Sequence, residues 1–123
     1  MQITGIRVIN RLGKRHQLSV AQEELAELIQ AISKYNRSLD NQFDKEKAKQ
    51  MIIEEMADVT IMMAQLIDIT EIKQSQIDAA IKLKTLRMEE RLNKLQEEDK
   101  NRELSLQDRI NFRNELRRLS EMI

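Results

Sequence analysis

The sequence predicts an all-α protein of one small domain, and three features of its composition support this prediction. Pro is absent from the 123 residues, Gly occurs only twice, and aromatic residues make up 2% of the chain. Charged residues make up 34%, and the helix-favouring Leu, Met, Glu, Gln, Lys and Arg are frequent. Gly and Pro disfavour helices, and aromatic and β-branched residues favour strands. This composition therefore indicates helices rather than a sheet.

The first 35 residues are expected to hold a lead-in and one long helix. Segment 1–17 is irregular or a short helix, because its two Gly residues disfavour a regular one. Its apolar residues are Ile3, Ile6, Ile9 and Leu12. The long helix is predicted from Ser19, spaced with Gln22 as a capping box, to about Tyr35. Its main apolar face is Leu18, Ala21, Leu25, Leu28 and Ile32.

A second long helix is predicted from Asp44 to Asp68, after a turn-rich segment at 36–42. Apolar residues again recur every three or four positions, and the many Ile and Met residues indicate burial on most sides. The apolar face is Ala48, Ile52, Met56, Val59, Met63 and Leu66.

Two further helices are predicted after residue 74, separated by a turn at the very polar segment 97–103. Ser75 with Asp78, and Ser105 with Asp108, have the spacing of helix-start signals. The apolar faces are Ile77, Ile81, Met88, Leu92 and Leu95, and then Phe112, Leu116, Leu119 and Ile123. We expect these helices to form an outer layer or to bury these faces against a second copy of the chain.

The bulk properties predict a cytoplasmic protein without nucleic acid or membrane as a partner. The 21 acidic and 21 basic residues give zero formal net charge, so no overall attraction to a polyanion is expected. Cys is absent, which excludes disulfides and thiolate chemistry. The sequence contains no apolar run of membrane-spanning length and no apolar segment of a signal peptide.

Two pairs of acidic residues stand where the long helices should carry buried apolar side chains. The first line is Val20, Glu24, Glu27 and Ala31, and the second is Met51, Glu55, Asp58 and Met62. Both lines have helical spacing, so each acidic pair shares one face. Four carboxylates on such faces repel one another and lose hydration unless a cation lies among them. The second helix offers no Lys or Arg after Lys49, so a metal ion is the expected cation.

Oxygen ligands alone select a hard cation, so Mg²⁺ is expected, with Mn²⁺ as a substitute. A di-iron bundle would need Glu-x-x-His pairs, and the sole His, His16, lies outside the predicted helices. We interpret His16 as a surface or capping residue.

The segments EELAE, with Glu23, Glu24 and Glu27, and EMAD, with Glu55 and Asp58, resemble the EExxE…ExxD motif of the MazG-like all-α nucleoside triphosphate pyrophosphohydrolases. The resemblance covers about residues 18–92. It implies an antiparallel helical bundle that assembles as a homodimer or homotetramer. It also implies a catalytic domain at 1–98, with an additional C-terminal helix of unassigned role at 99–123.

The resemblance implies an enzyme that cleaves NTP or dNTP to the monophosphate and pyrophosphate. Glu24, Glu27, Glu55 and Asp58 would be the metal ligands. Glu23 and Glu54 would be the catalytic neighbours that orient ligands or the attacking water. Metals in such a site neutralise the triphosphate and lower the pKa of a bound water.

Substrate contacts are expected from Lys84 and Arg87 on phosphate, with Arg91 a further candidate. Lys34, one turn beyond Ala31, is placed to reach a phosphate, and Gln30 stands where related enzymes contact the base. Each of these residues also fits a solvated helix face. The alternative function is a non-catalytic helical module that binds another protein through its C-terminal helix.

Overall fold

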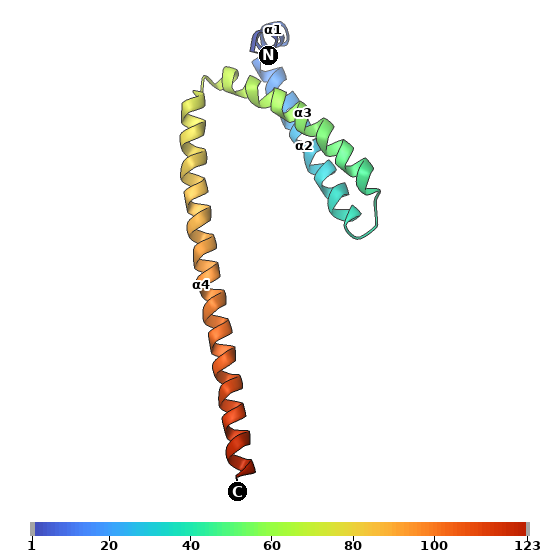
Figure 1. The fold of residues 1–123 in the computed structure, drawn as a ribbon. Coiled ribbons are helices and arrows are strands. Elements are labelled where there is room, and N and C mark those ends of the chain that lie inside the picture. The colour runs from blue at the N-terminus through green and yellow to red at the C-terminus, as the bar shows by residue number, and fades with distance from the viewer. Residues whose placement is uncertain (1, 123) are drawn as a thin grey trace. The chain divides into compact units, whose positions relative to one another are not determined.

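The computed structural model describes residues 2–122, and these form four helices and no strand (Figure 1). The helices are α1 (Gln2–Leu12), α2 (Lys14–Ser38), α3 (Lys45–Thr70) and α4 (Gln74–Glu121). The all-α prediction is therefore confirmed. The chain divides into two compact units, Met1–Gln74 and Ser75–Ile123. The predicted division between residues 98 and 99 falls inside α4, and the roles assigned to its two sides stay predictions.

Gly13 sets the boundary between α1 and α2. It has φ 92°, in the region that favours Gly, and its N–H donates to the carbonyl of Ile9 at 2.8 Å. The chain thus turns here and starts α2 at once, so the predicted start at Ser19 is wrong. The Ser19 hydroxyl instead donates to the Arg15 carbonyl at 3.2 Å, inside the helix.

A short turn joins α2 to α3 and makes the two helices an antiparallel hairpin (Figure 1). α2 continues three residues past the predicted end at Tyr35, because segment 36–38 contains no helix breaker. Asn41 adopts φ 59° in the turn. Asp44 then caps α3 by accepting the N–H of Lys47 at 2.8 Å, so the predicted start of this helix is confirmed.

One heptad-spaced row from each helix forms the contact between α2 and α3, here called the seam. Its buried residues are Gln17, Ala21, Ala31 and Ser38 on α2, and Ala48, Val59, Met62 and Gln65 on α3. Small side chains at this contact let the two helices approach closely. At one end, Gln17 Nε2 donates to Gln65 Oε1 at 2.7 Å. α1 packs there too, where a Cβ on Gly5 would lie 3.4 Å from Gln65 Cγ.

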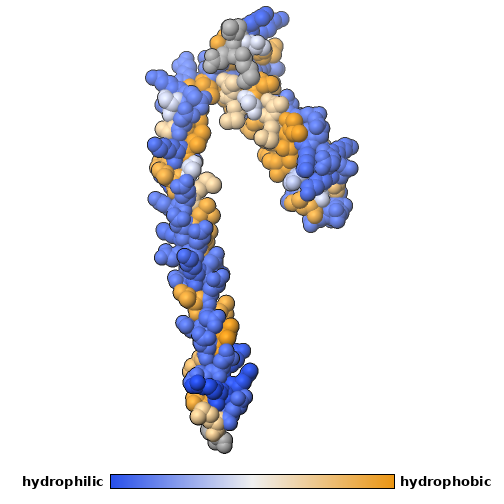
Figure 2. All heavy atoms as spheres, viewed as in Figure 1, coloured by the Kyte–Doolittle hydropathy of each residue, from blue (hydrophilic) through white to orange (hydrophobic). Residues whose placement is uncertain are grey.

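The predicted apolar faces of the long helices are only partly buried. Ala21, Ala48 and Val59 lie in the seam, but several predicted face residues are exposed: Leu18, Leu25, Ile32, Met56 and Met63. These side chains lie on the next row around each helix, because each helix carries two apolar rows and only one meets its partner. Figure 2 shows apolar side chains at the surface of the hairpin and of α4.

α4 is a single helix of 48 residues, so the predicted turn at 97–103 is wrong. That segment is polar but contains neither Gly nor Pro, and Arg102 pairs with Asp99 within it. None of the described residues of α4 is buried. Of the residues that the sequence places on apolar faces, Ile123 lies outside the described residues, and Ile3 is described only as part of the backbone of α1. In residues 2–122, no helix is both long and apolar enough to cross a membrane.

Candidate metal centre

Four carboxylates meet at the middle of the α2–α3 hairpin. Glu24 and Glu27 come from α2, and Glu55 and Asp58 come from α3. One oxygen of each residue lies within 4.8 Å of the corresponding oxygens of the other three. The antiparallel pairing causes this meeting, because it sets the middle of one acidic line against the middle of the other. The structure thus brings together all four residues that the motifs suggest as metal ligands.

The four carboxylates differ in burial. Glu24 and Glu55 are half-buried, whereas Glu27 and Asp58 are exposed. Glu24 and Glu55 continue the heptad rows of the seam, between Ala21 and Ala31 on α2 and between Ala48 and Val59 on α3. Glu27 and Asp58 project from one side of the seam, here called the carboxylate flank. The centre is therefore open to solvent on that flank.

Two carboxylate oxygens of the centre have no hydrogen-bond partner. Oε2 of Glu24 and Oε2 of Glu55 are buried, and neither accepts a hydrogen bond from the described residues. Burial, and after it the negative charges of Glu27 and Asp58, together raise the pKa of Glu24 to about 7. Burial also raises the pKa of Glu55, with the charge of Glu27 as the next cause. Without a cation, this arrangement stabilises the protonated acid and disfavours the carboxylate.

The donor set fits a hard divalent cation. All four candidate ligands are carboxylates, which suit Mg²⁺ and Mn²⁺, and the orphaned oxygens of Glu24 and Glu55 are free to coordinate an ion. His16 is exposed and lies outside this group, and its Nδ1 is 2.8 Å from Oε1 of Gln17. The group therefore lacks the His ligands that a di-iron helical bundle requires.

Glu23 and Glu54 flank the centre without belonging to it. Both are exposed, and each is one helical turn from an exposed ligand candidate, Glu23 from Glu27 and Glu54 from Asp58. Oε1 of Glu54 accepts a hydrogen bond from Gln50 at 3.4 Å. Their helical positions place both residues on the carboxylate flank, at the open edge of the centre.

The predicted substrate contacts fall in two groups. Gln30 and Lys34 follow Glu27 on α2 at helical spacing, so they continue along the carboxylate flank. Lys84, Arg87 and Arg91 are exposed residues of α4, in the second compact unit. The structure does not relate that unit to the hairpin, so their contact with substrate stays a prediction.

Lys34 was predicted from the sequence, but the two other basic residues that lie around Phe43, the aromatic residue of the turn between α2 and α3, were not. The charged groups of Lys34, Arg37 and Lys47 lie 6.0, 5.9 and 6.0 Å from the centre of the Phe43 ring. We call these three residues the cation triad. The sequence feature that could have indicated this group is a single Phe in the predicted turn with basic residues before and after it.

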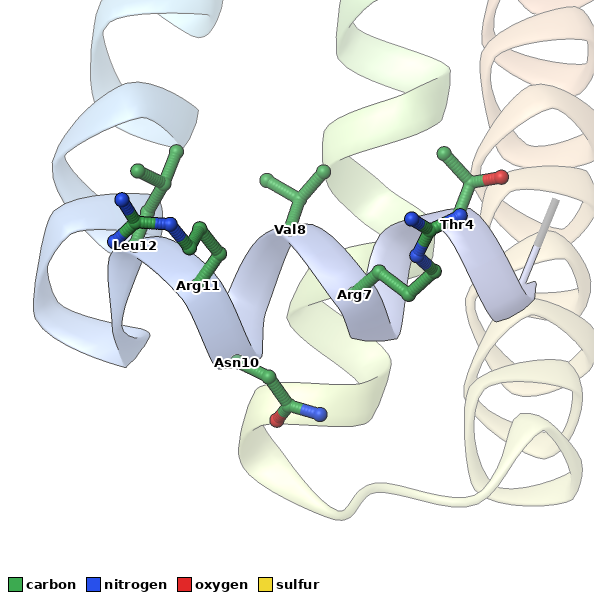
Figure 3. Close-up of a pocket in the computed structure, with 6 residues that line it drawn as sticks. All are labelled: Thr4, Arg7, Val8, Asn10, Arg11 and Leu12. Atoms are coloured by element: carbon green, nitrogen blue, oxygen red, sulfur yellow. The ribbon is translucent and has the colours of Figure 1, made fainter.

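A hollow of about 650 Å³ lies along α1, away from the carboxylates. Figure 3 shows its lining side chains, which include Arg7, Asn10 and Arg11. It contains none of the site residues predicted from the sequence and no acidic residue among those that line it. The hollow is thus separate from the four carboxylates.

Comparison of this chain with protein-family models, with curated proteins and with solved structures found no match.

Proposed function

We propose that the protein is a Mg²⁺-dependent nucleoside triphosphate pyrophosphohydrolase of the MazG-like type, releasing a nucleoside monophosphate and pyrophosphate. One observation carries the proposal: four carboxylates from two antiparallel helices meet, with two buried oxygens left unpaired. The EExxE and ExxD spacing supports the MazG-like assignment by resemblance. Mn²⁺ would substitute for Mg²⁺, because both are hard cations that bind carboxylate oxygens.

In this proposal Glu24, Glu27, Glu55 and Asp58 hold the metal. When bound, the metal supplies charge neutralisation for the phosphates and a more acidic water. The burial of Glu24 and Glu55 fixes two of the ligands on rigid helices, which favours a preorganised centre. The site faces solvent on the carboxylate flank, which is the side from which a nucleotide would enter.

The exposed carboxylates beside the centre have a separate role. Glu23 and Glu54 would orient the attacking water and accept its proton, because they are exposed and one turn from the ligand candidates. Lys34 and Gln30 would contact phosphate and base further along α2. Lys84 and Arg87 would add positive charge from α4. Phosphoryl transfer relies mainly on such positioning and charge stabilisation.

The proposal includes assembly of at least two copies of the chain. The side of the hairpin opposite the carboxylate flank, here called the apolar flank, carries Leu18, Leu25, Ile29, Ile32, Ile53, Met56 and Met63, each 38–67% exposed. Exposed apolar side chains gathered on one side of a protein mark association surfaces. A second copy would cover this flank with its own and leave both carboxylate flanks open.

Screening the common NTPs and dNTPs with Mg²⁺, and measuring pyrophosphate against orthophosphate, tests the proposed reaction. Pyrophosphate release that disappears in Glu24→Gln and Asp58→Asn would support it. Glu46→Gln is the matched control, because Glu46 is an exposed α3 carboxylate paired with Lys49 at 3.4 Å. Unchanged turnover in both site variants, or release of orthophosphate alone, contradicts the assignment.

The second candidate function is a non-catalytic module that binds another protein. The exposed apolar residues of α4 favour it, since a long helix in water gains most of its stability from packing against a partner. Titration with Mg²⁺ and Mn²⁺, with and without nucleotide, separates the two functions. Absence of metal binding in both conditions favours the module over the enzyme.

A further inference from the structure

The turn between α2 and α3 gathers positive charge around one aromatic ring. Lys34 and Arg37 come from the last two turns of α2, and Lys47 comes from the first turn of α3. All three approach the half-buried Phe43 ring within 6.0 Å of its centre. Cations attracted to the same ring are held near one another, although like charges repel.

No carboxylate of residues 2–122 neutralises this triad with an ion pair. Two acidic residues at the start of α3, the N-cap Asp44 and Glu46, have bonding partners other than the charged groups of the triad. Asp44 accepts the N–H of Lys47 as the helix cap, and Glu46 pairs with Lys49. The triad therefore keeps donors that are free to bind an anion from solution.

Two members of the triad, Lys34 and Lys47, share one side of the hairpin with the metal centre. Lys34 lies two helical turns beyond Glu27 on α2, and Lys47 lies two turns before Glu54 on α3. Helical periodicity keeps residues seven apart on nearly the same face, about 10 Å apart along the axis. Thus both helices of the carboxylate flank run from acidic residues at the middle to basic residues at the turn.

We propose that Lys34, Arg37 and Lys47 bind the terminal phosphates of a polyphosphate substrate whose scissile end lies at the carboxylates. Phe43 is the shared neighbour of the three charged groups. The identity of the anion rests on the proposed function. The triad extends the earlier role of Lys34 by adding Arg37 and Lys47, which donate to phosphate oxygens through charge-assisted hydrogen bonds.

The ligand is a small polyphosphate rather than a polynucleotide. Nucleic acid needs an extended basic stripe, whereas this group is confined to one turn. The same flank carries Glu23, Glu27, Glu54 and Asp58, whose charges repel a long polyanion. A short anion fits both halves of the flank when one of its ends lies at the triad and a metal ion neutralises the other end beside the carboxylates.

The test is calorimetric titration of the full chain with inorganic triphosphate in EDTA. The wild-type chain should bind, and the Arg37→Gln/Lys47→Gln double variant should bind at least about tenfold more weakly, because charge-assisted donors are lost. Lys49→Gln is the matched control, since it removes one α3 charge on the opposite side of the helix and should change affinity less than about twofold. Circular dichroism checks the fold. If the double variant does not fold, the single variant Lys47→Gln is titrated in its place.

Absent triphosphate binding by the wild-type chain overturns the proposal, and so does equal weakening by Lys49→Gln. The outcome is separable from that of the proposed function. Because the titration contains no metal, Glu24→Gln should leave triphosphate binding intact even though it abolishes hydrolysis. Binding without any nucleotide hydrolysis would uphold the triad and sink the enzyme assignment. Nucleotide hydrolysis by the wild-type chain, together with unchanged triphosphate affinity in the double variant, would uphold the enzyme assignment and overturn the role of the triad.

Discussion

At the scale of single residues, Glu24 and Glu55 are the unusual side chains of this protein. Each occupies a position in the seam, where its buried neighbours along the helix are Ala or Val. Each also has a buried oxygen with no hydrogen-bond partner among the described residues. Burial of an unpaired carboxylate costs stability, so such residues persist where they have a function. The cost and the proposed metal site are two consequences of the same geometry.

Glu24→Gln should raise the Tm of the metal-free protein at pH 8 by a few degrees and abolish pyrophosphate release. The amide removes one repelling charge and can donate a hydrogen bond to a neighbouring carboxylate. Affinity for Mn²⁺ should fall at least about tenfold, since even residues that only support ligands cost that much. Thermal melts and Mn²⁺ titration measure both effects.

The matched control is Glu46→Gln, which should change neither quantity. A lower Tm for the metal-free Glu24→Gln protein would show that the carboxylate is stabilising, contrary to the geometry.

The metal-free protein should lose stability as pH rises from about 4.5 to about 7. Glu24 has an ordinary pKa of 4.5 when unfolded and a pKa of about 7 when folded. Between these values the folded state binds more protons than the unfolded state, so the free energy of unfolding falls with increasing pH. Glu55 shifts in the same direction. Thermal melts in EDTA across this range measure the slope.

Mg²⁺ should reverse this trend, because it competes with the proton for the same carboxylates and binds better above pH 7. Glu24→Gln should flatten the slope in EDTA. A Tm that rises steadily from pH 5 to pH 8 in EDTA would contradict the raised pKa values.

At the scale of the elements, the seam explains why two helices of ordinary composition form a defined pair. Ala21, Ala31 and Ala48 are almost wholly buried, with Ala48 at 0% exposure. Such residues allow close approach of the helix backbones, and this approach brings carboxylates from both helices within reach of one ion. The small side chains therefore matter to the site although none is a ligand candidate.

Ala48→Leu should destabilise the protein by about 1–3 kcal/mol, because a larger side chain at a close contact forces the helices apart. Ala57→Leu is the control, since Ala57 is exposed on the same helix and should change stability by less than about 0.5 kcal/mol. Urea unfolding followed by circular dichroism measures both. Equal effects of the two substitutions would show that the seam is not closely packed.

At the scale of the whole molecule, the hairpin offers two unlike sides. One carries the carboxylates with Lys34 and Lys47, and the other carries exposed Ile, Leu and Met residues. In the proposed function, the first side holds the metal site and the second side is the contact between copies of the chain. It favours an assembly in which each copy keeps its own centre open.

Light scattering of the purified chain should give a mass of at least twice 14.5 kDa. The Ile29→Glu/Met56→Glu double variant should shift the mass to that of the monomer, because it places charges in the proposed contact. Leu116→Glu in α4 is the control for a different apolar surface. A monomeric wild-type chain, or loss of the assembly only with Leu116→Glu, would rule out the apolar flank as the interface.

The sequence alone predicted the fold class, the start of α3 and the two acidic pairs. The absence of Pro and the frequency of helix formers predicted the all-α class, and Asp44 marked the start of α3. The two acidic pairs were visible because helical spacing is local, so three positions along the chain suffice to put two side chains on one face. The candidate ligands were found for the same reason.

The tertiary structure decided what depends on a partner. Each long helix has two apolar rows, and only the antiparallel pairing selects the seam row and leaves Leu25 and Met56 exposed. The sequence also failed to predict that α4 continues through residues 97–103. A very polar segment is typical of turns, but charged residues without Gly or Pro do not break a helix. Lys47 belongs to a different helix from Lys34 and Arg37, and the turn that carries Phe43 brings the three residues around one ring. Spacing along one helix thus determined which side chains stand together on it, whereas contact between helices determined which of them meet.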